Sequence, residues 1–312
     1  MAAARPFRFG LQVLAAESRT ALVERARRAE AHGFSILQTA DHLDELLPPL
    51  VTLATVAEAT TALRLGTLVL NNDLRHPVVL AREAAAVYLL SEGRLELGMG
   101  AGHGEPEYRS AGLPFDRPGV RIARLAESLA VLDGLLAGRE VTSHGTHYTV
   151  TAARVFPRPV QRPRPPLLVG GGGRKVLALA ARTADVVGLT GTGPTRADGR
   201  HLVPSHWAPA AVDAQVAHVR AESEAAGRPV PELHALVQVV TVSDDRRGAL
   251  EAIRPHLPEL SLEDLEGTPY LLVGTVDALV EQLQGARERW GISYVTVRDE
   301  ALAPVVARLA GT

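Results

Sequence analysis

The sequence predicts a (β/α)8 TIM barrel, an α/β fold built as one domain over residues 1–312. Three observations predict it. Short apolar runs bounded by turn-forming residues alternate with longer amphipathic runs along the whole chain, about eight of each. The length suits one large domain, and no change in composition marks a second one. A doubly wound parallel sheet is the alternative that the same alternation allows.

The clearest unit of this alternation is the segment Arg64–Tyr108. Arg64–Leu70 and Arg94–Met99 are short apolar runs, and Pro77–Leu90 between them has apolar residues at helical spacing. Two strands joined by a helix form a parallel unit with a right-handed crossover. The second strand runs into Gly98–Gly104, where every other residue is glycine, so the backbone can pass close to a bulky ligand. A mobile loop without a ligand is the alternative.

The remaining elements are read in the same way. Ser18 is a typical N-cap residue before an amphipathic stretch, and Gly33 is a typical residue after its end. Phe156–Pro166 is rich in proline and predicts an extended linker, whereas Gly191–Pro209 lacks periodicity and predicts a lid or an irregular segment. The other expected strands are Phe7–Val13, Ser35–Thr39, Leu167–Val169, Ala184–Leu189, Glu232–Val242 and Ile292–Val297, with a hairpin at Glu140–Thr149. The other expected helices are Arg19–His32, Pro49–Thr61, Val120–Leu136, a helix after Gly173 that ends near Arg182, Ala210–Ala226, Asp244–Leu257, Val276–Trp290 and a closing helix.

The composition excludes several classes of function. With a net charge of -2, the chain has no basic surplus that would indicate a nucleic acid or an anionic membrane as partner. It has no cysteine, which excludes disulfides, thiolate metal sites and a cysteine nucleophile. The N-terminal sequence lacks the apolar core of a signal peptide, and no apolar run reaches the length of a membrane span, so we expect a cytoplasmic protein.

Four motifs resemble the luciferase-like flavin and deazaflavin oxidoreductases, in the same order and at compatible spacings from about residue 7 to 300. They are Glu30–Phe34 with Ala40–His42, Ala81–Glu83 with Ser91–Gly102, Pro166–Gly172, and Leu179–Asp185. The resemblance implies a barrel with loop insertions at the carboxyl ends of the strands, where an isoalloxazine-type ring binds, and no tightly bound metal. Many similar members use coenzyme F420, which transfers a hydride and does not readily activate oxygen; others use FMN.

Asp41 and His42 are the first catalytic candidates. They follow the expected second strand, and barrel enzymes carry their chemistry at such strand ends. A histidine exchanges protons near neutral pH, as hydride transfer to or from carbon requires. The resemblance implies that His42 lies beside the reactive edge of the cofactor, while Asp41 orients His42 or the cofactor. A capping aspartate beside a packed histidine is the alternative.

Further cofactor contacts are expected where the third and fourth strands end. Leu70, Asn71 and Asn72 close the third strand, and the resemblance implies a non-prolyl cis peptide bond there, at Val69–Leu70 or Leu70–Asn71, behind the cofactor ring. An ordinary trans turn is the alternative. After the fourth strand, the backbone amides of Ala101 and Gly102 are placed to bind ribityl or ring oxygens.

His103 is a second acid/base candidate. Deazaflavin sugar-phosphate dehydrogenases of the resembling family have a catalytic glutamate at this position, so the histidine argues against a sugar-phosphate substrate. Glu107 lies in a stretch that resembles the family segment before the long helix, and we expect it to be structural.

A phosphate site is expected where the fifth helix begins. Four glycines precede it: Gly170, Gly171, Gly172 and Gly173. Exposed amides and the helix dipole favour an anion, and Arg174 and Lys175 add positive charge. Thr190, after the sixth strand, is placed to donate its hydroxyl to the same phosphate. A flexible glycine turn is the alternative.

Other enzyme classes fit less well. A Rossmann dehydrogenase needs G-x-G-x-x-G opening a helix, whereas here glycine occupies every second position. No metal is expected, because His144 and His147 lie in the hairpin without a third ligand nearby, and the first strand supplies no His or Asp for a barrel hydrolase.

We therefore expect an oxidoreductase that transfers a hydride between F420 and a small organic substrate, for example by reducing a polarised double bond that His42 or water then protonates. The alternatives are an FMN-dependent luciferase-like monooxygenase and a cofactor-less barrel that acts as a binding partner. The resemblance implies a homodimer, and a separate flavin or F420 reductase as a source of reduced cofactor. The sequence does not identify the substrate, because the irregular segments 103–119 and 191–209 are expected to shape the substrate pocket.

Overall fold

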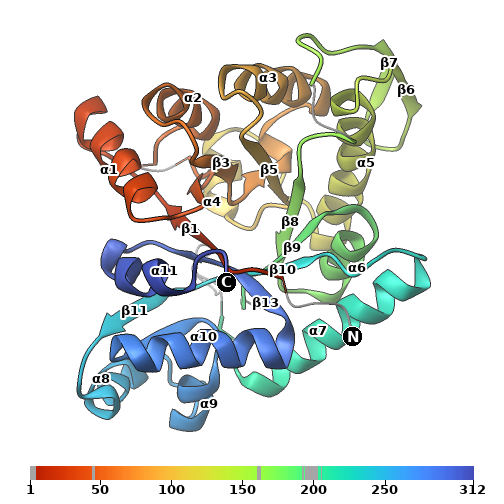
Figure 1. Ribbon diagram of the computed structural model, residues 1–312. Helices are drawn as coiled ribbons and strands as arrows, with labels where there is room; N and C mark the ends of the chain where they lie inside the picture. The colour runs from red at the N-terminus through yellow and green to blue at the C-terminus, as the bar shows by residue number, and fades with distance from the viewer. Residues whose placement is uncertain (1–4, 44–45, 160–162, 192, 194–202, 205) are drawn as a thin grey trace.

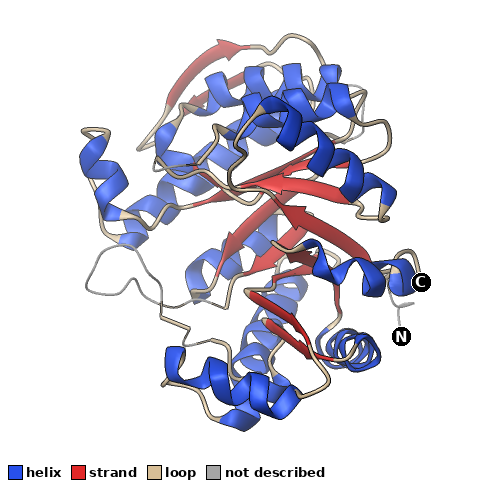
Figure 2. Ribbon diagram, turned by 90° about the vertical axis from the view of Figure 1, so that its left-hand side faces the viewer, coloured by secondary structure: helices blue, strands red, loops and turns tan. Residues whose placement is uncertain are grey.

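The computed structural model describes residues 5–43, 46–159, 163–191, 193, 203–204 and 206–312. Within these residues, parallel strands form a closed barrel surrounded by helices (Figures 1 and 2). In order around the barrel, the strands are β1 (Arg8–Gln12), β2 (Ile36–Thr39), β3 (Arg64–Thr67), β5 (Leu95–Gly100), β8 (Leu167–Gly171), β9 (Val186–Leu189), β10 (Glu232–Leu236) and β13 (Ile292–Val297). The pairing of β13 with β1 and of β3 with β5 closes the ring, which confirms the predicted barrel and excludes the open doubly wound sheet.

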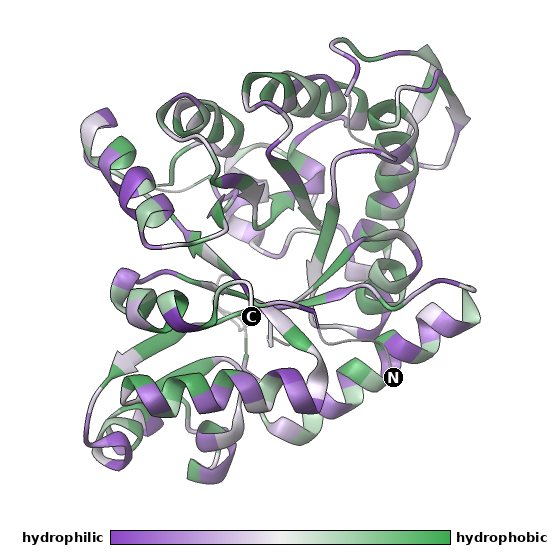
Figure 3. Cartoon of the chain, viewed as in Figure 1, coloured by the Kyte–Doolittle hydropathy of each residue, from purple (hydrophilic) through white to green (hydrophobic). Residues whose placement is uncertain are grey.

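Helices cover the outside of the barrel, with the main apolar core between the two layers. They are α1 (Arg19–Ala31), α2 (Pro49–Ala59), α3 (Pro77–Leu90), α4 (Glu105–Ser110), α5 (Pro118–Leu136), α6 (Arg174–Thr183), α7 (Pro209–Ala225), α8 (Arg246–Ile253), α9 (Leu262–Gly267), α10 (Val276–Trp290) and α11 (Ala303–Leu309), with short 3-10 turns η1 (Asn72–Leu74), η2 (Arg254–His256) and η3 (Glu300–Leu302). Figure 3 shows hydrophilic residues along α1 and α10, whereas the barrel strands are mostly hydrophobic. None of the described helices has the length and apolar content needed to span a bilayer.

The first helix shows why sequence signals place these elements. The Ser18 side chain accepts a hydrogen bond from the Ala21 amide at 3.1 Å, as an N-cap does. The residues that α1 buries, among them Leu22 and Ala26, recur at helical spacing. Gly33, just after the helix, has φ +83°, a backbone conformation that favours glycine. The predicted caps of this helix are confirmed.

Charged side chains close the amino-terminal end of the barrel. Arg8 pairs with Glu96 at 2.8 Å and with Glu232 at 2.9 Å, and Arg64 also binds Glu96. The Arg8 guanidinium lies 4.1 Å from the centre of the Tyr294 ring. Because all of these residues lie in the first half of their strands, they fill the barrel at that end and leave its carboxyl-terminal mouth for a site.

The predicted third strand breaks in the middle. It ends at Thr67, and the chain continues as β4 (Leu70–Asn71) beside β5. The non-prolyl cis peptide bond lies at Leu68–Val69, so both predicted positions were wrong by one or two bonds. The side chain of Val69 rather than Leu70 reaches the mouth, because Leu70 is buried in the core between barrel and helices.

Several elements were not predicted. Glu232–Val242 is two strands: β10 stays in the barrel, and β11 (Val239–Val242) leaves it to pair with β12 (Leu271–Gly274). The Gln238 amide donates to the Tyr270 carbonyl at 2.8 Å, which draws the chain away from the barrel at that point. The sequence also missed β12, α9 and α4. The hairpin consists of β6 (Val141–His144) and β7 (Thr149–Ala153), while most of Gly191–Pro209 lies outside the described residues.

Candidate active site

The centre of the mouth is an apolar platform formed by Val69. A Cβ atom on Gly100 would lie 2.6 Å from Val69 Cγ2, and one on Gly170 would lie 3.0 Å from Val69 Cγ1. Glycine at both positions therefore lets Val69 lie between β5 and β8. Beneath it, the Gln12 side-chain amide donates to the Leu68 carbonyl at 2.9 Å. A flat ring can rest on this surface, since no side chain rises from either glycine.

Asp41 ties the end of β2 to the end of β4. It is buried, and its two carboxylate oxygens accept from Arg75 at 2.5 and 3.1 Å. One of them also accepts from the Asn71 amide at 3.0 Å. These bonds direct the carboxylate toward Arg75 and Asn71, so Asp41 positions the backbone next to the platform.

His42 forms a pair with Glu107, which the sequence led us to regard as structural. Its Nδ1 lies 2.6 Å from Glu107 Oε1. Because a carboxylate oxygen accepts this hydrogen bond, the ring proton lies on Nδ1 and the lone pair on Nε2. The His103 ring packs edge-on against His42, with centroids 5.3 Å apart. The structure thus brings both predicted histidines together and adds a carboxylate from α4.

The surroundings of His103 keep it neutral. Burial, then the neighbouring His42 and Arg121, lower its pKa below the usual 6.5, and Glu107 only partly offsets them. Loss of hydration is the largest cause, because it disfavours the charged imidazolium. His103 therefore enters any reaction near neutral pH as an uncharged imidazole.

A hydrogen-bond network fixes the loop after β4. Tyr108 Oη lies 3.0 Å from both Asn71 Oδ1 and Asp73 Oδ2, and burial raises the pKa of Tyr108. The Asn72 amide donates to Tyr148 Oη at 3.1 Å, so this predicted cofactor contact faces the hairpin. Gly102, with φ +73°, allows the network: a Cβ there would lie 2.1 Å from Tyr108 Oη.

The glycine run at the end of β8 leads to an open helix N-terminus: Gly170 and Gly171 still belong to the strand, which is longer than predicted, and Gly172 and Gly173 form the turn. Gly173 is the N-cap of α6, and a Cβ on it would meet no atom within 4 Å. The Gly172 carbonyl accepts from the Gln215 side chain at 2.8 Å, which fixes the turn. Arg174 is exposed, and Thr190 is half-buried after the adjacent β9. Free amides, an adjacent cation and a hydroxyl suit a phosphate.

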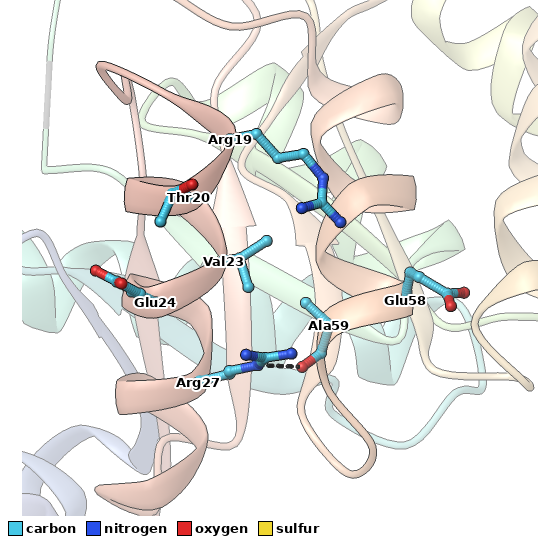
Figure 4. Close-up of a pocket in the computed structure, with 7 residues that line it drawn as sticks. All are labelled: Arg19, Thr20, Val23, Glu24, Arg27, Glu58 and Ala59. Carbon is cyan, nitrogen blue, oxygen red and sulfur yellow. Dashed lines mark hydrogen bonds between the residues drawn. The ribbon is translucent and has the colours of Figure 1, made fainter.

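Neither a metal cluster nor the surface cavity between α1 and α2 competes with this site. Among the described residues, no three His, Asp or Glu side chains are grouped to hold a metal ion. A cavity of about 330 Å³ lies between α1 and α2, on the outer helical layer (Figure 4). None of the predicted site residues lines this cavity. Its lining carries both charge signs and consists of Arg19, Thr20, Val23, Glu24, Arg27, Glu58 and Ala59.

Known proteins share this sequence and fold. The sequence matches the luciferase-like monooxygenase family over residues 2–260. It is 31% identical over 259 residues to an F420-dependent glucose-6-phosphate dehydrogenase of Nakamurella multipartita, covering 80% of this chain and 72% of that protein. It is 29% identical over 298 residues to the enzyme of that name from Amycolatopsis mediterranei, covering 91% of this chain and 83% of that protein.

Solved structures share the fold at lower identity. The coenzyme F420-dependent tetrahydromethanopterin reductase of Methanopyrus kandleri superposes with a TM-score of 0.78 at 19% identity, covering 98% of each chain. An F420-dependent secondary alcohol dehydrogenase superposes with a TM-score of 0.77 at 18% identity, covering 97% of this chain and 98% of that one. From the family match and the curated relatives we conclude that this chain belongs to the luciferase-like monooxygenase family.

Proposed function

We propose that this protein is an F420-dependent oxidoreductase that transfers a hydride between the coenzyme and a small organic substrate. The observation that carries the proposal is the pair His42–Glu107 beside the Val69 platform. Asp41, which precedes His42 in the sequence, accepts a hydrogen bond from the backbone amide of Asn71, two residues after Val69. The His42–Glu107 pair and the Val69 platform therefore lie at the same edge of the mouth. Relatives named as F420-dependent dehydrogenases support the choice of cofactor.

The residues present fit F420. Val69 would support the ring, the amides of Ala101 and Gly102 would bind its oxygens, and the open N-terminus of α6 would hold the phosphate. Arg174 and Thr190 would contribute a cation and a hydroxyl there. When bound, F420 supplies or accepts a two-electron hydride.

The protein's own residues handle the proton. Glu107 accepts a hydrogen bond from His42 Nδ1 and so directs proton exchange to Nε2. In the reducing direction, His42 delivers a proton from Nε2 to the substrate atom that gains negative charge when the neighbouring carbon gains the hydride; in the oxidising direction it removes that proton. His103, whose ring packs edge-on against His42, borders the same space.

The substrate differs from that of the curated relatives. Those relatives are named for glucose 6-phosphate, and the resembling sugar-phosphate dehydrogenases have a catalytic glutamate where this chain has His103. A neutral imidazole cannot replace the charge of a carboxylate. We therefore assign a substrate other than a sugar phosphate to this enzyme.

Titration with F420 and separately with FMN, followed by fluorescence, tests the proposal. Tight binding of F420 and weak binding of FMN support it; the reverse preference indicates an FMN-dependent monooxygenase, and binding of neither refutes a cofactor-dependent role. Gly173→Asp sharpens the test, because aspartate is a good N-cap but repels a phosphate. We expect it to raise stability and weaken F420 binding at least about tenfold, about 1.4 kcal/mol. Gly173→Ala fills the same open space without charge and is its control.

We further propose that the protein is a homodimer that uses the outer faces of α2 and α3. Large apolar side chains are exposed there: Val51 (69%), Val79 (51%), Leu89 (59%) and Leu90 (63%). The two helices lie side by side in Figure 1. Leu90→Glu should yield a monomer in light scattering, whereas Val242→Glu, on β11, should not. A separate F420 or flavin reductase and a cytoplasmic location stay predictions.

A further inference from the structure

Arg298 is a cation at the mouth that the site described above does not use. It follows β13, whose alternate residues face the barrel interior. Tyr294 belongs to the inner apolar cluster, and Thr296 Oγ1 donates to the buried Gln38 Oε1 at 2.6 Å. Arg298 is the next residue in this inward row, two positions on. Its side chain therefore rises at the rim of the barrel.

Two glutamines hold the guanidinium in place. Arg298 Nε donates to Gln12 Oε1 at 2.9 Å, and its NH1 nitrogen donates to Gln238 Oε1 at 2.9 Å. Both acceptors are neutral amide oxygens, and within the described part of the chain no carboxylate forms an ion pair with Arg298. The nearby Arg25 is itself paired with Glu300 and donates to the Arg298 carbonyl. Arg298 is thus a fixed, uncompensated charge whose NH2 nitrogen keeps its hydrogens for another acceptor.

The topology places this charge across the mouth from the glycine loop of β5. In the ring of strands β5-β8-β9-β10-β13-β1-β2-β3, β13 is four strands from β5 in either direction. Gln12 links the two sides, because its amide nitrogen holds the Leu68 carbonyl of the platform while its oxygen accepts from Arg298. A molecule bound to Arg298 would therefore extend over Val69, with His42 after β2 at its side.

We propose that Arg298, held by Gln12 and Gln238, binds the carboxylate of the substrate, so that this enzyme acts on a small organic acid. The proposal rests on the proposed hydride transfer and names the substrate class for it. A single planar guanidinium with neutral neighbours matches one carboxylate in charge and geometry. A phosphate, with about two charges, is held by clustered cations or a helix N-terminus, and the α6 N-terminus is assigned to the cofactor. An arginine guanidinium stays protonated in proteins near neutral pH, so the charge persists.

Calorimetric titration with simple acids tests this assignment. Acetate, benzoate and cinnamate, each compared with its primary amide, are titrated into the full-length protein with and without bound F420. We expect at least one acid to bind and its amide, which has the same shape without the charge, to bind at least about tenfold more weakly.

Variants assign the effect to Arg298. Arg298→Gln removes the charge, and Gln238→Glu supplies a carboxylate that pairs with it; both should weaken acid binding at least about tenfold while F420 binding is retained. Arg247→Gln removes the same charge from the exposed face of α8 and is the control. Equal acid binding by wild type and Arg298→Gln, or binding of no acid to the F420-bound wild type, overturns the assignment. Failure of F420 itself to bind refutes the proposed function instead, and the titrations without F420 still decide on Arg298.

Discussion

Replacing the glycines around Val69 by alanine should produce a graded loss of stability. A Cβ on Gly98 would lie 1.9 Å from the Thr67 carbonyl oxygen, one on Gly100 2.6 Å from Val69 Cγ2, and one on Gly170 3.0 Å from Val69 Cγ1. Ordinary contacts begin near 3.4 Å, so the required movements are about 1.5, 0.8 and 0.4 Å. The first must be made by backbone, the other two by a short branched side chain.

These movements set the expected magnitudes. Overpacking a core costs about 1–3 kcal/mol and occasionally more. We expect about 3 kcal/mol or more for Gly98→Ala, about 2 for Gly100→Ala and about 1 for Gly170→Ala in the free energy of unfolding. Gly285→Ala is the control, because Gly285 lies in α10 with no atom within 4 Å of its added Cβ, and it should stabilise the protein by up to about 1 kcal/mol.

Urea unfolding followed by tryptophan fluorescence measures the series, and F420 titration follows the platform. Gly100→Ala displaces Val69 and should weaken F420 binding at least about tenfold, whereas Gly285→Ala should leave it unchanged. If Gly98→Ala proved as stable as the wild type, or if the order of the three were reversed, the geometry of the platform would be wrong.

Three further predictions concern the barrel interior and the loop after β4. Glu96→Gln leaves Arg8 and Arg64 without their shared carboxylate, and since both arginines are partly exposed we expect a loss of about 2 kcal/mol in the free energy of unfolding, measured with urea. The control Glu140→Gln, at an exposed ion pair, should cost under about 0.5 kcal/mol. Equal losses in the two variants would contradict the network. Complete burial lowers the pKa of His234 from 6.5 to about 3, so on acidification the unfolded chain takes up this proton before the folded protein does. The free energy of unfolding should therefore fall as pH falls from about 6.5 toward 3, by up to about 1.4 kcal/mol per pH unit. His234→Gln should flatten this part of the stability curve, and an unchanged slope would refute the assignment. Tyr108→Phe removes the hydroxyl between Asn71 and Asp73 and should cost about 1–2 kcal/mol in urea unfolding, so a neutral effect would show that the network does not hold the loop.

Local patterns were sufficient for most of the barrel. Pro77–Leu90, Val276–Trp290 and Ile292–Val297 have the predicted bounds, because proline or a capping threonine begins the helices and glycine separates the last two elements. The prediction of one strand over Glu232–Val242 was wrong for the opposite reason. Its apolar and β-branched residues continue without a turn signal, and its second half pairs with a strand about thirty residues further along, which no local pattern reveals.

The sequence suggested residues for the candidate site but not the contacts between them. Glu107 contacts His42 across 65 residues of sequence, and nothing near Glu107 indicates that partner. The position of Val69 at the platform depends on Gly100 and Gly170, which lie on two other strands. The position of Arg298 could have been predicted from the sequence, because the alternation Tyr294, Thr296, Arg298 places it in the inward-facing row of its strand.

Among the described residues, the ion pairs of Arg8, Glu96 and Glu232 close the amino-terminal end of the barrel, opposite the proposed site. In the proposed function, the coenzyme and the substrate would both bind and leave through the carboxyl-terminal mouth. The one that lies deeper has to enter first and leave last. If the coenzyme rests on Val69 beneath its substrate, as proposed, the two would bind in a compulsory order, and substrate in excess would trap the spent coenzyme before it can be exchanged.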